Sequence, residues 1–232
     1  MLFSKPKIRP LTFSPEEIVC LQSGNKTQFR RPVKGGRYFS ESMDAGKNPG
    51  AIHPVLKCPY GQTGDRIWVR ETARSEWQRT LESPFLVQTG VQYRADKEYR
   101  EITAETKHKM FPAKARTTQG DLAWATPVGM PRWASRYLLE ISGSRLEKLA
   151  DISHEDAYEE GILTEVWDQT VVARNYDTPD SFFQFWSEEM DHYVEMNELY
   201  RRSYQSLWNQ IYGGDSWASN PLVWVVTFKL ID

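Results

Sequence analysis

A short segment near the N-terminus constrains the fold most, because it contains the signals for a helix and for both of its ends. Pro15 suits the first position of a helix, directly after Ser14. Apolar residues recur at helical spacing over residues 15–22, and Gly24 fits the left-handed residue that follows a helix end. The sequence therefore predicts a helix over residues 15–22.

The residues that follow Gly24 bring several polar groups together. Lys26 and Thr27 are followed closely by Arg30 and Arg31. Ammonium, hydroxyl and guanidinium groups at this spacing suit a phosphate, a carbonyl group or the edge of a nucleobase. A solvent-exposed basic turn explains the charges equally well, so other motifs have to decide between the two interpretations.

Composition bounds the class of protein. A chain of 232 residues can form one large domain or two small ones. Its nine tryptophans, 11 tyrosines and 10 phenylalanines indicate a compact core, an aromatic-lined pocket, or both. Because the formal net charge is −2, any contact with nucleic acid requires a local basic patch.

The sequence also indicates a cellular compartment. Cys20 and Cys58 provide neither a disulfide framework nor a zinc site of their own, and no spacing among the histidines suggests a metal. We therefore expect no metal and no cofactor. Residues 1–7 lack the apolar core of a signal peptide, and the apolar run over residues 222–228 is too short to span a bilayer. These features predict a soluble, cytoplasmic protein without a membrane partner.

Alternation of apolar and polar residues predicts a strand over residues 66–71. Strands are also predicted over residues 87–94, 137–141 and 222–231, the last from its continuous apolar run, with a short strand within residues 1–14. Residues 145–149 continue the strand over 137–141 or pair with it.

Helices and loops fill most of the remainder. Ser153 and Gly161 mark the two ends of a second helix. Aromatic residues at three- and four-residue spacing over residues 180–212 predict one long or two shorter amphipathic helices. Residues 33–57 and 97–120 are predicted loops. Short strands with few βα alternations favour an α+β fold on a small mixed sheet or barrel.

Five segments, in this order, carry a resemblance to a known family: residues 24–27, 64–71, 130–136, 151–161 and 220–226. Together they resemble the ASCH-domain proteins of the PUA-like superfamily, in particular the long type found in phages and prophages. The resemblance implies a single domain over residues 1–232, with insertions at about 72–126 and 164–200. It also implies a small mixed β-barrel with helices at its mouth, helical insertions, and a pocket that binds RNA or modified nucleobases.

The resemblance further implies a set of catalytic residues. A smaller bacterial relative is an amidohydrolase that removes the acyl group from the exocyclic amine of N(4)-acetylcytidine. It uses a lysine and a threonine of the motif Gly-x-Lys-Thr-x-Thr, with a glutamate of the following helix. By motif, the lysine falls on Lys26 and the glutamate on Glu160. The catalytic threonine falls on Phe29, where this chain departs from the motif.

Amide hydrolysis requires a nucleophile, a base and a donor for the oxyanion. We expect Lys26 as the base and Glu160 as its acid/base partner, with the Thr27 hydroxyl or a water held between the pair as nucleophile. A lysine serves as a base only where burial or a neighbouring cation disfavours its charge. Phe29 is a candidate for stacking on a base, with core packing as the alternative, and Arg31 for holding a pyrimidine carbonyl or a phosphate.

Further substrate-binding candidates come from the other motifs. Glu71, at a strand end, can accept a hydrogen bond from an exocyclic amine, or form a structural salt bridge with Arg70 or Arg136. Arg136 belongs to the same candidate set. Trp68 and Trp133 are candidates for pocket walls, with burial in the core as the alternative.

Two hypotheses follow for the function. The first is a metal-independent amidohydrolase, a hydrolase of non-peptide C–N bonds, acting on acylated cytosine nucleosides such as N(4)-acetylcytidine. The second is a non-catalytic PUA-like module that binds RNA or modified nucleobases, which the departure at Phe29 favours. A metal-dependent ribonuclease has little support, because the sequence shows no acidic or histidine cluster. The expected partners are a modified cytosine nucleoside and RNA.

Overall fold

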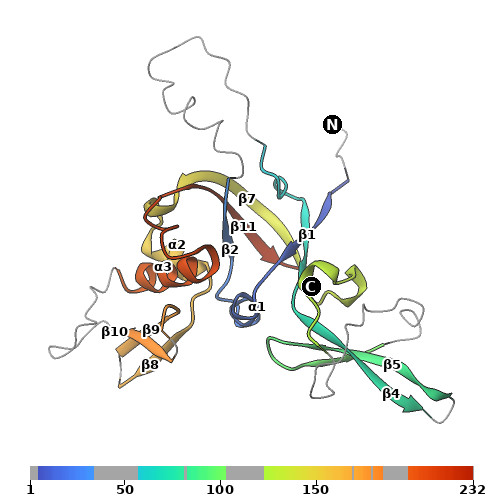
Figure 1. The fold of residues 1–232 in the computed structure, drawn as a ribbon. Coiled ribbons are helices and arrows are strands. Elements are labelled where there is room, and N and C mark those ends of the chain that lie inside the picture. The colour runs from blue at the N-terminus through green and yellow to red at the C-terminus, as the bar shows by residue number, and fades with distance from the viewer. Residues whose placement is uncertain are drawn as a thin grey trace. The chain divides into compact units, whose positions relative to one another are not determined.

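The computed structural model describes residues 5–33, 57–80, 83–102, 123–168, 170–178, 180–184 and 198–231. These residues form a mixed α+β fold with three sheets (Figure 1). None of the three sheets closes on itself, so the β-barrel that the family resemblance implies is not found among them. No helix in this part of the chain combines the length and the apolar character needed to cross a membrane.

The chain divides into two compact units. The first unit consists of Met1–Gly24, Gly64–Glu140 and Lys229–Asp232. The second unit consists of Asn25–Thr63 and Ile141–Phe228.

The first unit begins with β1 (Ile8–Thr12) and α1 (Pro15–Gln22). Ser14 caps α1: its hydroxyl accepts a hydrogen bond from the Glu17 amide at 3.2 Å, and its own amide donates to the Glu17 carboxylate at 2.8 Å. Gly24 has φ of 79°, the left-handed conformation expected after a helix end. The predicted helix is therefore confirmed at both ends.

Two strand pairs complete the first part of this unit. β1 pairs in parallel with β3 (Arg66–Arg70), and β3 pairs antiparallel with the first residues of β7 (Leu138–Lys148). Short 3₁₀ turns at Pro127–Gly129 and Arg132–Ala134 precede β7. The strands predicted over 66–71 and 137–141 are confirmed, and the latter continues through residues 145–148.

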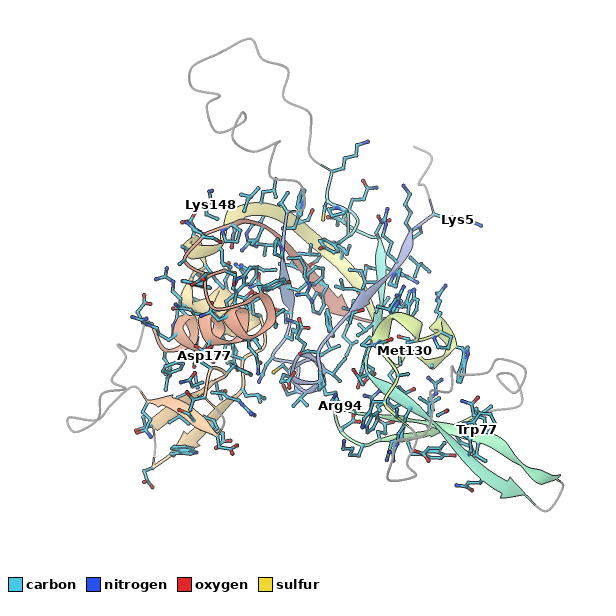
Figure 2. The ribbon with its side chains drawn as sticks, viewed as in Figure 1. Lys5, Trp77, Arg94, Met130, Lys148 and Asp177 are labelled. Carbon is cyan, nitrogen blue, oxygen red and sulfur yellow. The ribbon has the colours of Figure 1, made fainter. Side chains whose placement is uncertain are left out.

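A second, antiparallel sheet in the first unit has the order β4-β5-β6: Ala73–Thr80, Ser83–Tyr93 and Tyr99–Glu101. β5 covers the strand predicted over 87–94, but β4 and β6 were missed. The residues of β4 that face the core, Ala73 and Ser75, are small, so the strand lacks an apolar signal. It is pairing with β5 that fixes β4, and Trp77 lies along this strand in Figure 2.

In the second unit, the sheet order is β7-β11-β2, with β11 (Leu222–Leu230) antiparallel to β2 (Gln28–Pro32). A 3₁₀ turn, Leu149–Asp151, leads from β7 to α2 (His154–Glu159). Ser153 accepts a hydrogen bond from the Asp156 amide at 3.0 Å, and Gly161 has φ of 81°. The predicted second helix and the predicted last strand are thus confirmed.

α2 packs with α3 (Leu199–Tyr212) over a core that includes Trp208, Leu207, Val223 and Val225. This core anchors the two helices to β11. The packing matters for the site, because it brings α2 next to β2.

The third sheet, also in the second unit, has the order β10-β9-β8: Ser181–Gln184, Thr170–Asn175 and Thr164–Trp167. The helix predicted over 180–212 is therefore wrong at its start, where residues 181–184 form a strand. Aromatic residues suit either state, and antiparallel pairing with β9 decides here. α3 accounts for residues 199–212, whereas 185–197 lie outside the described residues. So does most of the loop predicted over 33–57.

Candidate functional site

The residues after Gly24 alternate between two sides of an extended strand. Successive side chains of a strand point to opposite faces. Lys26, Gln28 and Arg30 therefore share one face, and all three are buried, with at most 3% of the residue exposed. Thr27 and Phe29 belong to the other face. The backbone of this segment is fixed by a bridge between Lys26 and residue 160 and by the pairing of β2 with β11.

The two residues named as a catalytic pair lie together. Lys26 Nζ donates a hydrogen bond to the main-chain carbonyl of Glu160 at 2.6 Å, and lies 3.5 Å from Glu160 Oε2. The side chains are 1% and 2% exposed, although 134 positions separate them in the sequence. Glu160 is the C-cap of α2, and Gly161 then turns the chain away. Although Glu160 stands at a helix end, its carboxylate is buried and not exposed to solvent.

Arg30 connects Glu160 to two further carboxylates. Its Nη1 donates to Glu160 Oε1 at 2.8 Å, its Nη2 to Asp156 Oδ2 at 2.7 Å, and its Nε to Glu147 Oε1 at 2.9 Å. The guanidinium is fully buried. Arg145 pairs with two of the same carboxylates from the more exposed side. The set is named the Arg30 cluster, and its members are Lys26, Arg30, Arg145, Glu147, Asp156 and Glu160.

The charges of the Arg30 cluster balance, which allows them to be buried. Three cations face three carboxylates, and buried charges persist only when they are paired and hydrogen-bonded. Burial by itself would lower the pKa of Arg30. The combined effect of Glu160, Tyr204 and Glu147 nevertheless raises this pKa above its ordinary value, so Arg30 stays charged. Burial and the charge of Glu160 raise the pKa of Tyr204 on α3 well above its ordinary value, which keeps this phenol neutral.

Gln28 supports the cluster from the same face of β2. Its Nε2 donates to the main-chain carbonyl of Asp156, to Asp156 Oδ1 and to Glu159 Oε2, at 3.0, 3.0 and 3.1 Å. Burial alone would raise the pKa of Asp156, but the Gln28 hydrogen bond and the charges of Arg30 and Arg145 lower it below the ordinary value.

The depressed pKa of Asp156 predicts acid sensitivity. A carboxyl with a lower pKa in the folded state stabilises the fold above its unfolded pKa, near 3.9, and loses this contribution as the pH falls through its folded pKa. We expect the free energy of unfolding, from denaturant titrations, to fall between about pH 4 and pH 2. Asp156→Asn should reduce this slope. If the free energy of unfolding of Asp156→Asn falls with pH as steeply as that of wild type, Asp156 does not cause the acid sensitivity.

Thr27, Phe29 and Arg31 have different surroundings from Lys26. The Thr27 side chain is exposed, while its amide donates to the carbonyl of Glu159 at 2.9 Å. Phe29 is fully buried, with its ring centroid 5.3 Å from that of Tyr60 in an edge-on contact. Arg31 lies over the Phe29 ring at 5.4 Å and donates to a main-chain carbonyl. Core packing, the alternative given for Phe29, is what the structure shows.

Glu71 and Arg136, in the first unit, form the salt bridge that was the structural alternative. Arg136 Nε and Nη2 donate to the two oxygens of Glu71 at 2.9 and 2.6 Å. Its Nη1 donates to Asp96 and Glu98, and its guanidinium lies 3.9 Å from the Tyr93 ring centroid. Burial raises the pKa of Glu71, against the opposing effect of Arg136. Arg136, just before β7, thus links the end of β3 to the turn between β5 and β6.

The two tryptophans named from sequence also belong to the first unit. Trp68 is partly buried, with its ring 4.9 Å from the Arg70 guanidinium carbon. Trp133 is partly buried against the small core under the β4–β6 sheet. Lys26, Thr27, Phe29, Arg31 and Glu160 all belong to the second unit. The structure thus brings Lys26 and Glu160 together, and each unit contains its own part of the predicted set.

Gln28 and Asp156 were not among the residues predicted from sequence, and Arg30 was named only as a cation near Lys26 and not as a site residue. The available signal was the alternation from Lys26, which places Gln28 and Arg30 on the same side. The described part of the chain holds no group of three or more histidine, cysteine, aspartate or glutamate residues suited to a metal ion. No protein-family model, curated protein or solved structure matches the chain.

Proposed function

We propose that this chain is a metal-independent amidohydrolase of the ASCH type, in the PUA-like superfamily. Its substrates would be cytosine nucleosides acylated on the exocyclic amine, such as N(4)-acetylcytidine. One observation supports the proposal above all: Lys26 and Glu160, which the family motif pairs, lie 3.5 Å apart and buried. A buried ammonium–carboxylate pair is a proton donor and a proton acceptor in one place.

The proton balance of the reaction is simple. Transfer of one proton from Lys26 Nζ to Glu160 Oε2 converts the ion pair into an amine and a carboxylic acid. The amine then removes a proton from water as the water oxygen adds to the acyl carbon. When the C–N bond breaks, Glu160 gives its proton to the cytosine nitrogen. The products are a cytidine and a carboxylic acid, and the ion pair is restored.

The two carboxylate oxygens of Glu160 have different partners and, in the proposed mechanism, different roles. Oε1 accepts the hydrogen bond from Arg30, while Oε2 faces Lys26. Arg30 therefore leaves one oxygen for proton transfer and holds the carboxylate in position. This makes Arg30 a positioning residue in the proposed mechanism.

Water is the nucleophile in this proposal, and not the Thr27 hydroxyl. Thr27 is exposed and belongs to the face of the strand opposite Lys26. We expect Thr27→Val to leave the rate of cytidine release within about twofold of wild type, since the methyl group replaces a hydroxyl outside the reaction. A loss of 100-fold or more, within the range of a catalytic group, would instead make Thr27 the nucleophile.

The proposal is tested by incubating the purified full chain with N(4)-acetylcytidine and measuring cytidine by chromatography. We expect release of cytidine that is unchanged by EDTA, because the mechanism uses no metal. Absence of cytidine release by the wild-type chain would reject the proposal. Release that EDTA abolishes would reject the metal-independent mechanism.

A non-catalytic nucleobase-binding module is the second candidate. The observation that favours it is Phe29, which stands where the motif has its catalytic threonine and is fully packed in the core. Binding of N(4)-acetylcytidine without turnover, measured by calorimetry, would support this alternative. Arg31→Ala would then weaken the binding if Arg31 holds the pyrimidine carbonyl.

A further inference from the structure

The β4–β6 sheet of the first unit has one buried face and one face that carries a row of polar and aromatic groups. Ala73, Ser75, Val91 and Tyr93 are buried on the inner face. On the outer face, three residues lie side by side across the strands through the register pairs Arg74–Gln92 and Gln92–Tyr99. The row consists of Arg74, Gln92 and Tyr99.

Trp124 extends this row on the far side of β4. Its neighbour Ala125 bridges to Ala73 and is buried in the inner core. Alternation therefore places Trp124 toward the outer side, where the Arg74 guanidinium carbon lies 4.9 Å from its ring centroid.

Tyr99 lies over Gly90 and is still exposed to solvent. A Cβ atom added at Gly90 would lie 2.3 to 2.5 Å from the ring atoms of Tyr99 and its hydroxyl, so the ring occupies the space above this glycine. The residue is nevertheless 44% exposed. An exposed aromatic ring that rests on a sheet is a surface on which an unpaired base can stack.

Three cations belong to the same sheet and to the turn that follows β5. The Nε of Arg74 donates hydrogen bonds to the side chains of Glu76 and Gln92. Arg94 is exposed at the end of β5, where Figure 2 labels it. The Lys97 Nζ lies 4.7 Å from the Trp124 ring centroid.

The turn holds Lys97 in a defined place. Lys97 has φ of 62°, unusual for a residue other than glycine, and its amide donates to the Tyr93 carbonyl at 3.0 Å. Its own carbonyl accepts from Gln92 Nε2 at 3.2 Å. The acids of the same turn, Asp96 and Glu98, are both paired with Arg136. The negative charges of the turn are thus neutralised, while its cations remain exposed.

We infer that this outer face binds a single-stranded nucleic acid. A base stacks on the exposed ring of Tyr99, and Arg74, Arg94 and Lys97 contact phosphates. Stacking selects a single strand, because the bases of a duplex are already stacked on one another. The chemistry is shared by RNA and DNA. The inference concerns the segment between β3 and β7 and is independent of the proposed hydrolase.

The test measures anisotropy of labelled octanucleotides, single-stranded RNA, single-stranded DNA and an RNA duplex, against the full chain at several salt concentrations. Three phosphate contacts predict a slope of log K against log salt of about −2 for a single strand. Tyr99→Leu should weaken binding at least about fivefold, with little change in slope. Lys97→Met should reduce the slope by about 0.7 to 1.

Two further variants separate the site from general effects. Gly90→Ala displaces the Tyr99 ring without removing it, so it should weaken binding as Tyr99→Leu does. Lys229→Met removes an exposed cation from β11 of the same unit and should leave both affinity and slope unchanged. Equal binding of the duplex, no binding of either single strand, or wild-type affinity in Tyr99→Leu would overturn the inference. Release of cytidine from N(4)-acetylcytidine does not enter any of these outcomes.

Discussion

Replacing Lys26 with methionine is expected to lower the rate of cytidine release from N(4)-acetylcytidine by about 10²- to 10⁴-fold. Methionine nearly matches the length of the lysine side chain but has no proton to transfer, and a positioned acid or base contributes a factor of this size. The loss should appear in kcat, because Lys26 acts on the water in the transition state of the proposed mechanism. Initial rates over a range of substrate concentrations measure it.

The fold should survive this change, which keeps the experiment interpretable. Glu160 retains the hydrogen bond from Arg30 at 2.8 Å, so its carboxylate is not left without a cation. Thermal unfolding of the variant checks this point. Lys229→Met is the matched control, since Lys229 is exposed on β11, and it should keep the wild-type rate. A folded Lys26→Met protein with wild-type kcat would remove Lys26 from the mechanism.

The parts of the fold that could be predicted from sequence are those with local signals. The ends of α1 and α2 are set by Ser14, Ser153, Gly24 and Gly161, which act within a few residues of themselves. The strands β3 and β11 have apolar residues in alternation or in a continuous run. Each signal is complete in its own segment, so no tertiary information was needed.

The missed strands depend on partners instead. Residues 181–184 have aromatic residues that fit a helix, but they pair with β9 and form β10. β4 turns small residues toward its core, and β6 has three exposed residues and is defined by pairing with β5. Such segments take their conformation from neighbours that a single-sequence pattern does not contain.

The same distinction applies to the candidate site. Lys26 and Glu160 were predicted because a family motif names both. Arg30 and Asp156 required the structure, since their contact joins positions 126 residues apart and depends on α2 packing beside β2. Alternation along the strand could have placed Arg30 on the side of Lys26. It could not have shown that three carboxylates converge on the guanidinium.

That convergence predicts the largest effect on stability, in Arg30→Met. The substitution leaves Glu147, Asp156 and Glu160 without their central cation, and removing one partner of a buried ion pair costs about 3–5 kcal/mol. We expect a decrease of this size in the free energy of unfolding at pH 7, measured by denaturant titration. Arg145→Met is the matched control, because Arg145 is 43% exposed and exposed pairs contribute at most about 1 kcal/mol.

Measuring the difference in the free energy of unfolding between wild type and Arg30→Met at several pH values shows whether unpaired carboxylates cause it. If uncompensated carboxylates destabilise Arg30→Met, protonating them relieves the penalty, so the gap from wild type should narrow as the pH falls below about 4. A gap that stays constant with pH would assign the loss to packing of the arginine side chain. A gap no larger than that of Arg145→Met would show that Arg30 does not compensate the buried carboxylates.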